Sequence, residues 1–255
     1  MKTTTLATVA IALALMAPCV RAESTIDFDD MIHGEIANSQ YLASHGVSMS
    51  AVNIGGGPDL AVAFDSALSN TRDPDLEGPP WSLDNLAGAP GADLGRFLVI
   101  AENGRDGNND GILDYPDDEG SRPAGSMLFE FDAPIDSFGF DLVDIEGPSE
   151  YGDDSGYLAT FYMGDVELGR VGFAEFLNSS SAFYDPTVSF GNNSANRIQP
   201  ITAAELGGLE FDKVEVNLGE SSYQSALERL FNEDFSAFAV SMPLESATTL
   251  MSDWA

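Results

Sequence analysis

The chain has 255 residues, and its 42 acidic and 10 basic side chains give a formal net charge of −32 at pH 7. Hydrophobic residues make up 44 % of it, which is typical of a folded globular protein. Such a negative charge repels nucleic-acid phosphates and anionic lipid. With a single cysteine, the composition argues against a nucleic-acid-binding protein, a polytopic membrane protein and a disulfide scaffold.

The N-terminus is typical of a secretory signal peptide. Lys2 supplies a positive charge, and Leu6–Ala17 is an apolar run too short to span a bilayer but long enough for a signal core. Val20-Arg21-Ala22 places compact residues at positions −3 and −1. We therefore predict a signal peptide at residues 1–22, cleavage before Glu23, and secretion to the extracellular space or to the periplasm of a Gram-negative host.

Cleavage also removes the only cysteine and leaves a chain that needs another stabilising link. Cys19 permits a lipoprotein site as a minor alternative, although Pro18 fits that motif poorly. The remaining 233 residues carry eight basic side chains and a formal charge of −34. Bound divalent cations would cross-link loops and neutralise charge together. Adaptation of an acidic surface to high external salt is the alternative explanation.

Residues 23–255 have the size of one β-domain, and their candidate strands are apolar or alternating runs between turn residues. These strands are Thr25–Phe28, Val47–Ile54, Leu60–Phe64, Phe97–Ala101, Met127–Phe131, Ile135–Val143, Tyr157–Met163, Val166–Phe173, Leu209–Leu218 and Phe235–Met242. Period-two alternation indicates one buried face and one wet face. The sequence predicts an all-β antiparallel β-sandwich of jelly-roll type, with short helices at Ile201–Leu206 and Ser222–Phe231 and long acidic loops at Asp65–Arg96 and Asn103–Ser126.

The first long loop carries acidic residues and a tryptophan. Asp73-Pro-Asp-Leu-Glu77 lies near Asp59 and Asp65 in the sequence, and alternate carboxylates of this kind can share a cation. A solvated acidic loop is the interpretation that we favour, because most such runs are solvated. Trp81 is a candidate for a ligand-stacking residue outside the core, with a plug at one end of the sandwich as the equal alternative.

The second long loop contains the most specific motif of the chain, Asp106-Gly-Asn-Asn-Asp-Gly-Ile-Leu-Asp-Tyr-Pro-Asp117. It matches a twelve-residue calcium loop, with Gly111 at the sharp turn of position 6 and Leu113 at position 8 as an apolar anchor to the body. The predicted ligands are Asp106, Asn108, Asp110, the carbonyl of Ile112, Asp114 and Asp117.

The calcium loop departs from a sensor EF-hand in two respects. Asp117 stands at position 12 in place of a bidentate glutamate, and no helices are predicted on either side. The loop therefore resembles those of dockerin and thrombospondin type 3 repeats, which implies a structural Ca²⁺. The alternative is a polar turn that holds no ion. Tyr115 within the loop is a second candidate for stacking on a sugar ring.

Signals for catalysis are weak. His33 and His45 lack metal-ligand spacing, and the sequence has no nucleophile-elbow motif. Asp144 and Glu146 leave the same face at the end of a predicted strand, as the acid and base of a glycosidase would. Leu142 occupies the nucleophile position of the strand motif in retaining jelly-roll glycosidases, so an enzyme is the less favoured hypothesis.

Several short motifs are shared with a known group of exported proteins. They are Phe28-Asp-Asp, Ala63-Phe-Asp-Ser, Phe97-Leu-Val-Ile-Ala-Glu102 and Ser137-Phe-Gly-Phe-Asp-Leu-Val-Asp144. Over residues 25–220 the chain resembles a family of secreted bacterial β-sandwich proteins of unknown function, many with a PEP-CTERM sorting signal. The resemblance implies association with exopolysaccharide or matrix. The segment after Met242 lacks a Pro-Glu-Pro triplet and a basic tail, so free secretion is expected.

The primary hypothesis is an exported, non-catalytic, calcium-stabilised β-sandwich that binds extracellular glycan or matrix. The first alternative is a calcium-requiring glycoside hydrolase or lyase that uses Asp144 and Glu146. The second alternative is a structural subunit of a matrix or surface layer. No nucleic-acid partner and no membrane span are expected.

Overall fold

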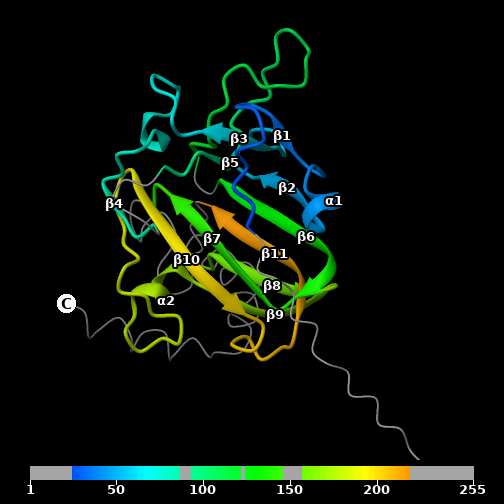
Figure 1. The fold of residues 1–255 in the computed structure, drawn as a ribbon, viewed down its shortest axis with the longest axis vertical. Helices are drawn as coiled ribbons and strands as arrows, with labels where there is room; N and C mark the ends of the chain where they lie inside the picture. Colours follow the sequence, from blue (N-terminus) through cyan, green and yellow to red (C-terminus); the bar gives the residue numbers. More distant parts are fainter. Residues whose placement is uncertain (1–24, 87–92, 122–123, 146–156, 219–255) are drawn as a thin grey trace, which may run out of the picture.

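A computed structural model of the chain describes residues 25–86, 93–121, 124–145 and 157–218 (Figure 1). The predicted signal peptide, Glu146, the predicted helix Ser222–Phe231 and the predicted strand Phe235–Met242 lie outside these residues. Within the described residues, no helix is both long and apolar enough to cross a membrane.

The described part of the chain is mostly strand, as predicted. The strands are β1 (Ile36–Ala37), β2 (Val47–Asn53), β3 (Ala61–Asp65), β4 (Leu83–Asp84), β5 (Arg96–Ile100), β6 (Gly125–Ile135), β7 (Ser137–Val143), β8 (Ala159–Met163), β9 (Val166–Val171), β10 (Ser194–Thr202) and β11 (Phe211–Leu218). The helices are α1 (Leu42–His45), the 3₁₀ turn η1 (Pro74–Leu76) and α2 (Phe173–Leu177).

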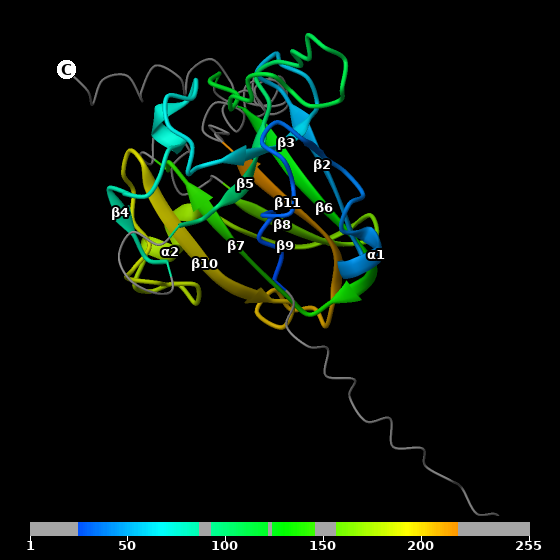
Figure 2. The ribbon, with the colours of Figure 1, turned by 45° about the horizontal axis from the view of Figure 1, so that its top comes forward.

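The strands form two layers. One layer is a five-stranded antiparallel sheet in the order β2-β6-β11-β8-β9. The other layer contains two three-stranded sheets, β1-β3-β5 and β4-β10-β7, of which only the short β4–β10 pair is parallel (Figures 1 and 2). The prediction of an all-β, largely antiparallel sandwich is confirmed.

Period-two alternation places the main core between the layers. In β2, Val47, Met49 and Ala51 are buried while the residues between them are more exposed. Val214 and Val216 of β11 join the same cluster. The apolar side chains that the sequence pattern assigns to one face therefore meet across the sandwich, which removes their surface from water.

The sheet β1-β3-β5 is covered on both faces. Ile100 of β5 belongs to the main core, whereas Val99 belongs to a second cluster on the outer face, together with Val62 of β3. Leu76 of the first long loop and Leu113 of the second complete this outer cluster. Both long loops therefore fold back over the same sheet, and Figure 1 shows them at the same end of the molecule.

Two predicted elements are wrong, and three strands were missed: the two-residue strands β1 and β4, and the longer β10. Ile201–Leu206 is not a helix, because Ile201 and Thr202 end strand β10 and a turn follows. The polar start of β10 and its Pro200 hid this strand; a bulge between Ile198 and Ile201 accommodates the proline. Thr25–Phe28 is not a strand, since none of its residues pairs with a described strand.

Candidate functional site

The chain segment that contains the predicted calcium loop leaves and returns to the body of the protein at the end of β5. The backbone N–H of Glu102 donates to the carbonyl oxygen of Asp117 at 3.1 Å, and that of Glu119 donates to Ile100 at 2.8 Å. The excursion is therefore closed at its base. This closure fixes Asp117 and its neighbour Asp118 against the body of the protein.

The middle of the loop is attached to the outer face of β1-β3-β5. Leu113 is only 4 % exposed and packs in the outer cluster with Val62. Its backbone N–H donates to the carbonyl oxygen of Gly34 at 2.8 Å, and Ile112 forms a β-bridge with Glu35. The prediction that position 8 of the loop is an apolar anchor is confirmed.

Within the loop, side-chain oxygens accept hydrogen bonds from the loop's own backbone. Asp106 accepts from the N–H of Asp110 at 3.2 Å and of Gly111 at 2.9 Å. Asn108 accepts from Asp110 at 3.0 Å, and Asp110 accepts from Ile112 at 2.9 Å. The bond from Gly111 is the main cause that lowers the pKa of Asp106 and keeps its carboxylate charged. These oxygens are held on one tight turn.

The carboxylates that converge most closely come from two loops. Among the described residues, only Asp73, Asp117 and Asp118 form a trio of potential metal ligands with one ligand atom each within 4.8 Å of the others. Asp117 is a predicted ligand, but Asp73 belongs to the first long loop and Asp118 follows the motif. Asp106, Asp110 and Asp114 form no such trio within the described residues. The predicted ligand set is thus divided between the turn and this carboxylate cluster.

The carboxylate cluster holds more negative charge than it can keep without a proton or a cation. Burial raises the pKa of Asp73 to about 8, and a hydrogen bond with Asp118 adds to this effect. Burial also raises the pKa of Asp117, helped by the charge of Glu102 and opposed by Arg72. At neutral pH, Asp73 therefore retains a proton unless a cation compensates its charge.

The donor set of the cluster suits a hard divalent cation. Asp73 caps η1, and its side chain accepts from the N–H of Asp75 at 3.2 Å, which orients the carboxylate. Calcium takes six to eight oxygen ligands. The three carboxylates, together with Glu102 beside Asp117, supply about half of them. Backbone carbonyls and water would complete the shell.

Only one residue of the acidic run in the first loop reaches the cluster. Asp73 does so, whereas Glu77 accepts two hydrogen bonds from its own loop, at 2.7 and 2.8 Å. Asp59 accepts from a backbone N–H at 2.8 Å, and Asp65 pairs with Arg96 at 3.0 Å. The favoured interpretation of a wholly solvated run is therefore wrong for Asp73. Its half-burial depends on a contact between loops that no local pattern signals.

The two aromatic ligand candidates have opposite environments. Tyr115 is 47 % exposed, and the guanidinium carbons of Arg72 and Arg105 lie 4.9 and 5.2 Å from its ring centre. Trp81 is only 6 % exposed and packs with Leu86. The prediction that Trp81 lies outside the core is wrong, because the chain folds its ring against the β4-β10-β7 sheet.

The described residues assemble no catalytic group around the two histidines. Nδ1 of His33 accepts the backbone N–H of Asp65 at 3.0 Å, and His45 contacts the hydroxyl of Ser44 at 2.8 Å. The oxygen Oδ1 of Asp144 accepts the N–H of Asn193 at 2.6 Å. Its proposed catalytic partner Glu146 lies outside the described residues, so this pair stays a prediction.

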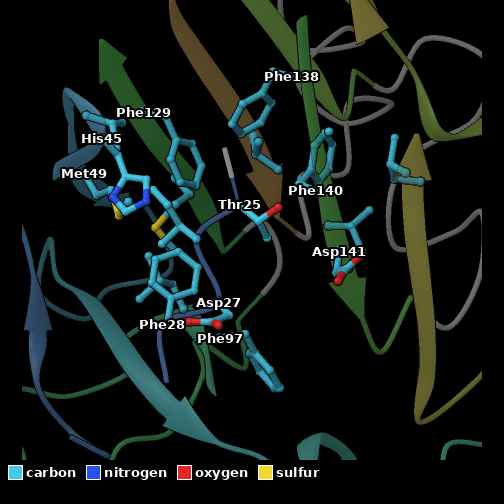
Figure 3. Close-up of a pocket in the computed structure, with 18 of the residues that line it drawn as sticks. Thr25, Asp27, Phe28, His45, Met49, Phe97, Phe129, Phe138, Phe140 and Asp141 are labelled. Atoms are coloured by element: carbon cyan, nitrogen blue, oxygen red, sulfur yellow. The ribbon is translucent and has the colours of Figure 1, made fainter. Parts of the chain in front are cut away.

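A cleft opens between β5 and β7, the neighbouring end strands of the two three-stranded sheets. Its volume is about 1670 Å³, and it reaches the inner face of β6. Figure 3 shows Thr25 and Asp27 inside it, among the rings of Phe97, Phe129 and Phe140. This is a feature that the sequence did not reveal.

No protein-family model, curated protein or solved structure matched the chain. The resemblance to exported bacterial β-sandwich proteins therefore stays a prediction. Fold and geometry define the class of protein: an all-β sandwich whose two long loops converge on a carboxylate cluster.

Proposed function

We propose that the protein is a calcium-stabilised binding module and that Ca²⁺ binds at the carboxylate cluster. The observation that carries the proposal is the convergence of Asp73, Asp117 and Asp118 within 4.8 Å. The elevated pKa of Asp73 supports it, because a cation could replace the proton that the ion-free cluster must hold. The turn Asp106–Asp114 is proposed as a second calcium site on the strength of its motif.

Calcium in the cluster would strengthen the link between two loops that already meet in the outer cluster, at Leu76 and Leu113, and through the hydrogen bond between Asp73 and Asp118. The formal charge of −32 makes the ion-free chain repel itself, most strongly where carboxylates are crowded. Each bound ion removes two negative charges and fixes both loops on the outer face of β1-β3-β5. This is the stabilising role that disulfides have in other secreted domains.

We further propose that the ordered loops present a surface for extracellular glycan or matrix, without catalysis. Tyr115 supports this part, because its ring is exposed within the loop that calcium would order. The signal-like N-terminus supports export. A polysaccharide-degrading enzyme and a matrix subunit remain the alternatives, and no described feature favours either of them.

Thermal unfolding of residues 23–255 with calcium or with chelator, at matched ionic strength, tests the metal site. An ion at about 100 times its dissociation constant adds about 2.7 kcal/mol, or roughly 5 to 10 °C in melting temperature for a domain of this size. Asp118→Asn should remove most of this shift. Asp165→Asn makes the same charge change at an exposed residue and should keep it. An equal calcium shift in both variants would contradict the proposed cluster site.

Retention on a panel of immobilised neutral and acidic glycans, with calcium and with chelator, tests the binding role. We expect retention that requires calcium and that falls about tenfold in Tyr115→Ala, the order of effect for an aromatic stacking contact. Tyr184→Ala, which removes another exposed tyrosine, is the matched control. Release of reducing sugars in the same panel would favour the enzyme alternative.

A further inference from the structure

Strand β7 has one bonded edge and one free edge. The backbone of Asp144 bonds to the start of β10, and that of Asp136 bonds to the turn after it, so even-numbered residues face β10. Backbone groups of an antiparallel strand alternate in direction. The backbone N–H and C=O groups of Gly139, Asp141 and Val143 therefore point away from β10 and toward the cleft. Within the described residues, no strand pairs with this edge.

The neighbouring β5 does not close this gap. It pairs with β3 alone among the described strands and lines the opposite side of the cleft. The segment Thr25–Asp29 lies in between, but only Asp29 bonds to β5. Its oxygens accept from the backbone N–H and the guanidinium of Arg96 at 3.2 and 2.7 Å. Residues 25–28 form no ladder with either strand in the described structure.

Four phenylalanine rings line the inner part of the cleft, whereas its lining as a whole also includes acidic side chains such as Asp27 and Asp141. Phe129 and Phe131 of β6 lie 5.2 and 6.1 Å, centre to centre, from the ring of Phe138 on β7, and Phe140 follows at 5.6 Å. All four rings are only partly buried. These residues are on the inner faces of a sandwich, where side chains of a further strand would normally cover them.

We propose that residues 235–242 of the same chain bind in this cleft as an added strand on the free edge of β7. Leu218, the last residue described, itself lines the cleft, and 37 residues of the sequence follow it. The segment Phe235–Met242 carries no charge in a chain that is otherwise crowded with acidic residues. Its apolar side chains could therefore cover the phenylalanine rings, and its lack of charge avoids repulsion by the acidic residues of the lining.

The connection is long enough to reach the cleft. Residues 219–234 separate Leu218 from Phe235, and even if Ser222–Phe231 forms the predicted helix, the link spans about 15 Å of helix plus about 20 Å of extended chain. Main-chain bonds to Gly139, Asp141 and Val143 would satisfy the free edge, while alternate side chains would cover Phe138 and Phe140. The added strand would also narrow the gap to β5.

Hydrogen exchange measured on residues 23–255 and on a chain ending at residue 218 tests this proposal. We expect amides of Gly139, Asp141 and Val143 to exchange at least about tenfold more slowly in the longer chain. Val240→Asp should remove that protection, because it places a negative charge against the phenylalanine rings and near the carboxylates of the lining. Thr248→Asp makes the same charge change outside the segment and should not. A peptide of residues 233–244 should restore protection to the shortened chain.

Disulfide trapping gives a second measurement that does not depend on truncation. The processed chain has no cysteine, so pairs of cysteines can be introduced without competing thiols. Val143→Cys combined with Ala237→Cys or Ala239→Cys forms a disulfide only if β7 and the segment Phe235–Met242 lie side by side. We expect one of these pairs to cross-link within the chain, whereas Val52→Cys, on an exposed position of β2, should not cross-link with Ala239→Cys.

Two results would overturn the proposal. One is equal exchange at Gly139, Asp141 and Val143 in the long chain, the short chain and Val240→Asp. The other is protection of these amides only when a glycan is added, which would make the cleft a ligand site. Neither result depends on bound calcium, so this test remains valid even if the protein proves not to bind calcium.

Discussion

At the scale of single residues, His33 couples folding to pH. Its Nδ1 accepts a backbone hydrogen bond from Asp65, and burial lowers its pKa, against the raising effect of the Asp65 charge. A folded-state pKa below the ordinary value of about 6.5 means that the unfolded chain binds the proton more readily. The contribution of His33 to stability is therefore complete above pH 6.5 and is lost as the pH falls through that value toward the folded pKa.

Urea unfolding of wild type, His33→Asn and His45→Asn between pH 7.5 and 5 tests this coupling. Asn offers an uncharged acceptor near the position of Nδ1, so His33→Asn should lose part of the fall in unfolding free energy that wild type shows below pH 6.5. His45→Asn should retain the wild-type slope. Identical slopes for the wild type and His33→Asn would exclude His33 as the titrating group.

Repulsion in the carboxylate cluster predicts that Asp118→Asn stabilises the ion-free protein. The change removes one charge beside Asp73 and Asp117, whose pKa values are both raised in the folded state. After solvent screening we expect a gain of about 1 kcal/mol in chelator at pH 7.5. Chemical unfolding in chelator measures it, with Asp165→Asn as the control for net charge. A loss of stability would show that the hydrogen bond between Asp73 and Asp118 stabilises the cluster more than repulsion between the carboxylates destabilises it.

At the scale of elements, Gly34 decides whether the second long loop can lie on the body. Its φ is +89°, and a Cβ there would be 2.2 Å from the carbonyl oxygen of Leu113. Gly34→Ala should cost about 1 to 3 kcal/mol and weaken calcium binding, because Leu113 must move out of the outer cluster. Gly120→Ala meets no atom within 4 Å and should change stability by less than about 0.5 kcal/mol. Melting curves with and without calcium measure both effects.

Glu119 anchors the end of the same loop to the glycine-rich turn after β2. Its buried carboxylate accepts from the side chain of Asn53 at 2.9 Å and from the backbone N–H groups of Gly57 and Ser121 at 3.2 and 2.9 Å. Burial alone would raise its pKa, but these bonds outweigh burial and lower it. Glu119→Ala should destabilise by about 2 to 3 kcal/mol in urea unfolding, because three partly buried donors lose their acceptor. Glu119→Gln should cost less, because its amide oxygen can still accept some of these bonds. Equal costs for both variants would indicate that charge alone matters.

Elements with clear local patterns were predicted within a few residues. Strands β2, β3, β5, β7 and β11 alternate or are apolar over most of their length, and the sequence located each of them. Strand β10 was missed because its polar start and Pro200 hide the alternation, and α2 because the predicted strand Val166–Phe173 extends to its first residue. Short-range patterns therefore identify strands whose apolar and polar residues alternate over most of their length, and they fail where polar residues and a proline hide that alternation.

At the scale of the whole molecule, the net charge predicts salt-dependent stability. A chain at −32 repels itself over distances of about 30 Å in 0.01 M salt and about 3 Å in 1 M. Raising sodium chloride between these limits should therefore increase the melting temperature by several degrees, with choline chloride giving the same rise. Calcium should act at concentrations too low to alter ionic strength. If sodium matched calcium at equal ionic strength, the stabilisation would be screening alone.

The sequence by itself determined that the chain is an acidic all-β protein, and that Leu113 ties an aspartate-rich loop to its body. Those properties follow from composition and from patterns of neighbouring residues, which survive any rearrangement of distant segments. Only the tertiary structure decided that Asp73 joins Asp117 and Asp118, that Trp81 is buried and that a cleft separates β5 from β7. Each of these depends on contacts between residues far apart in the chain, and such contacts are set by how the long loops pack over one sheet rather than by any local repeat.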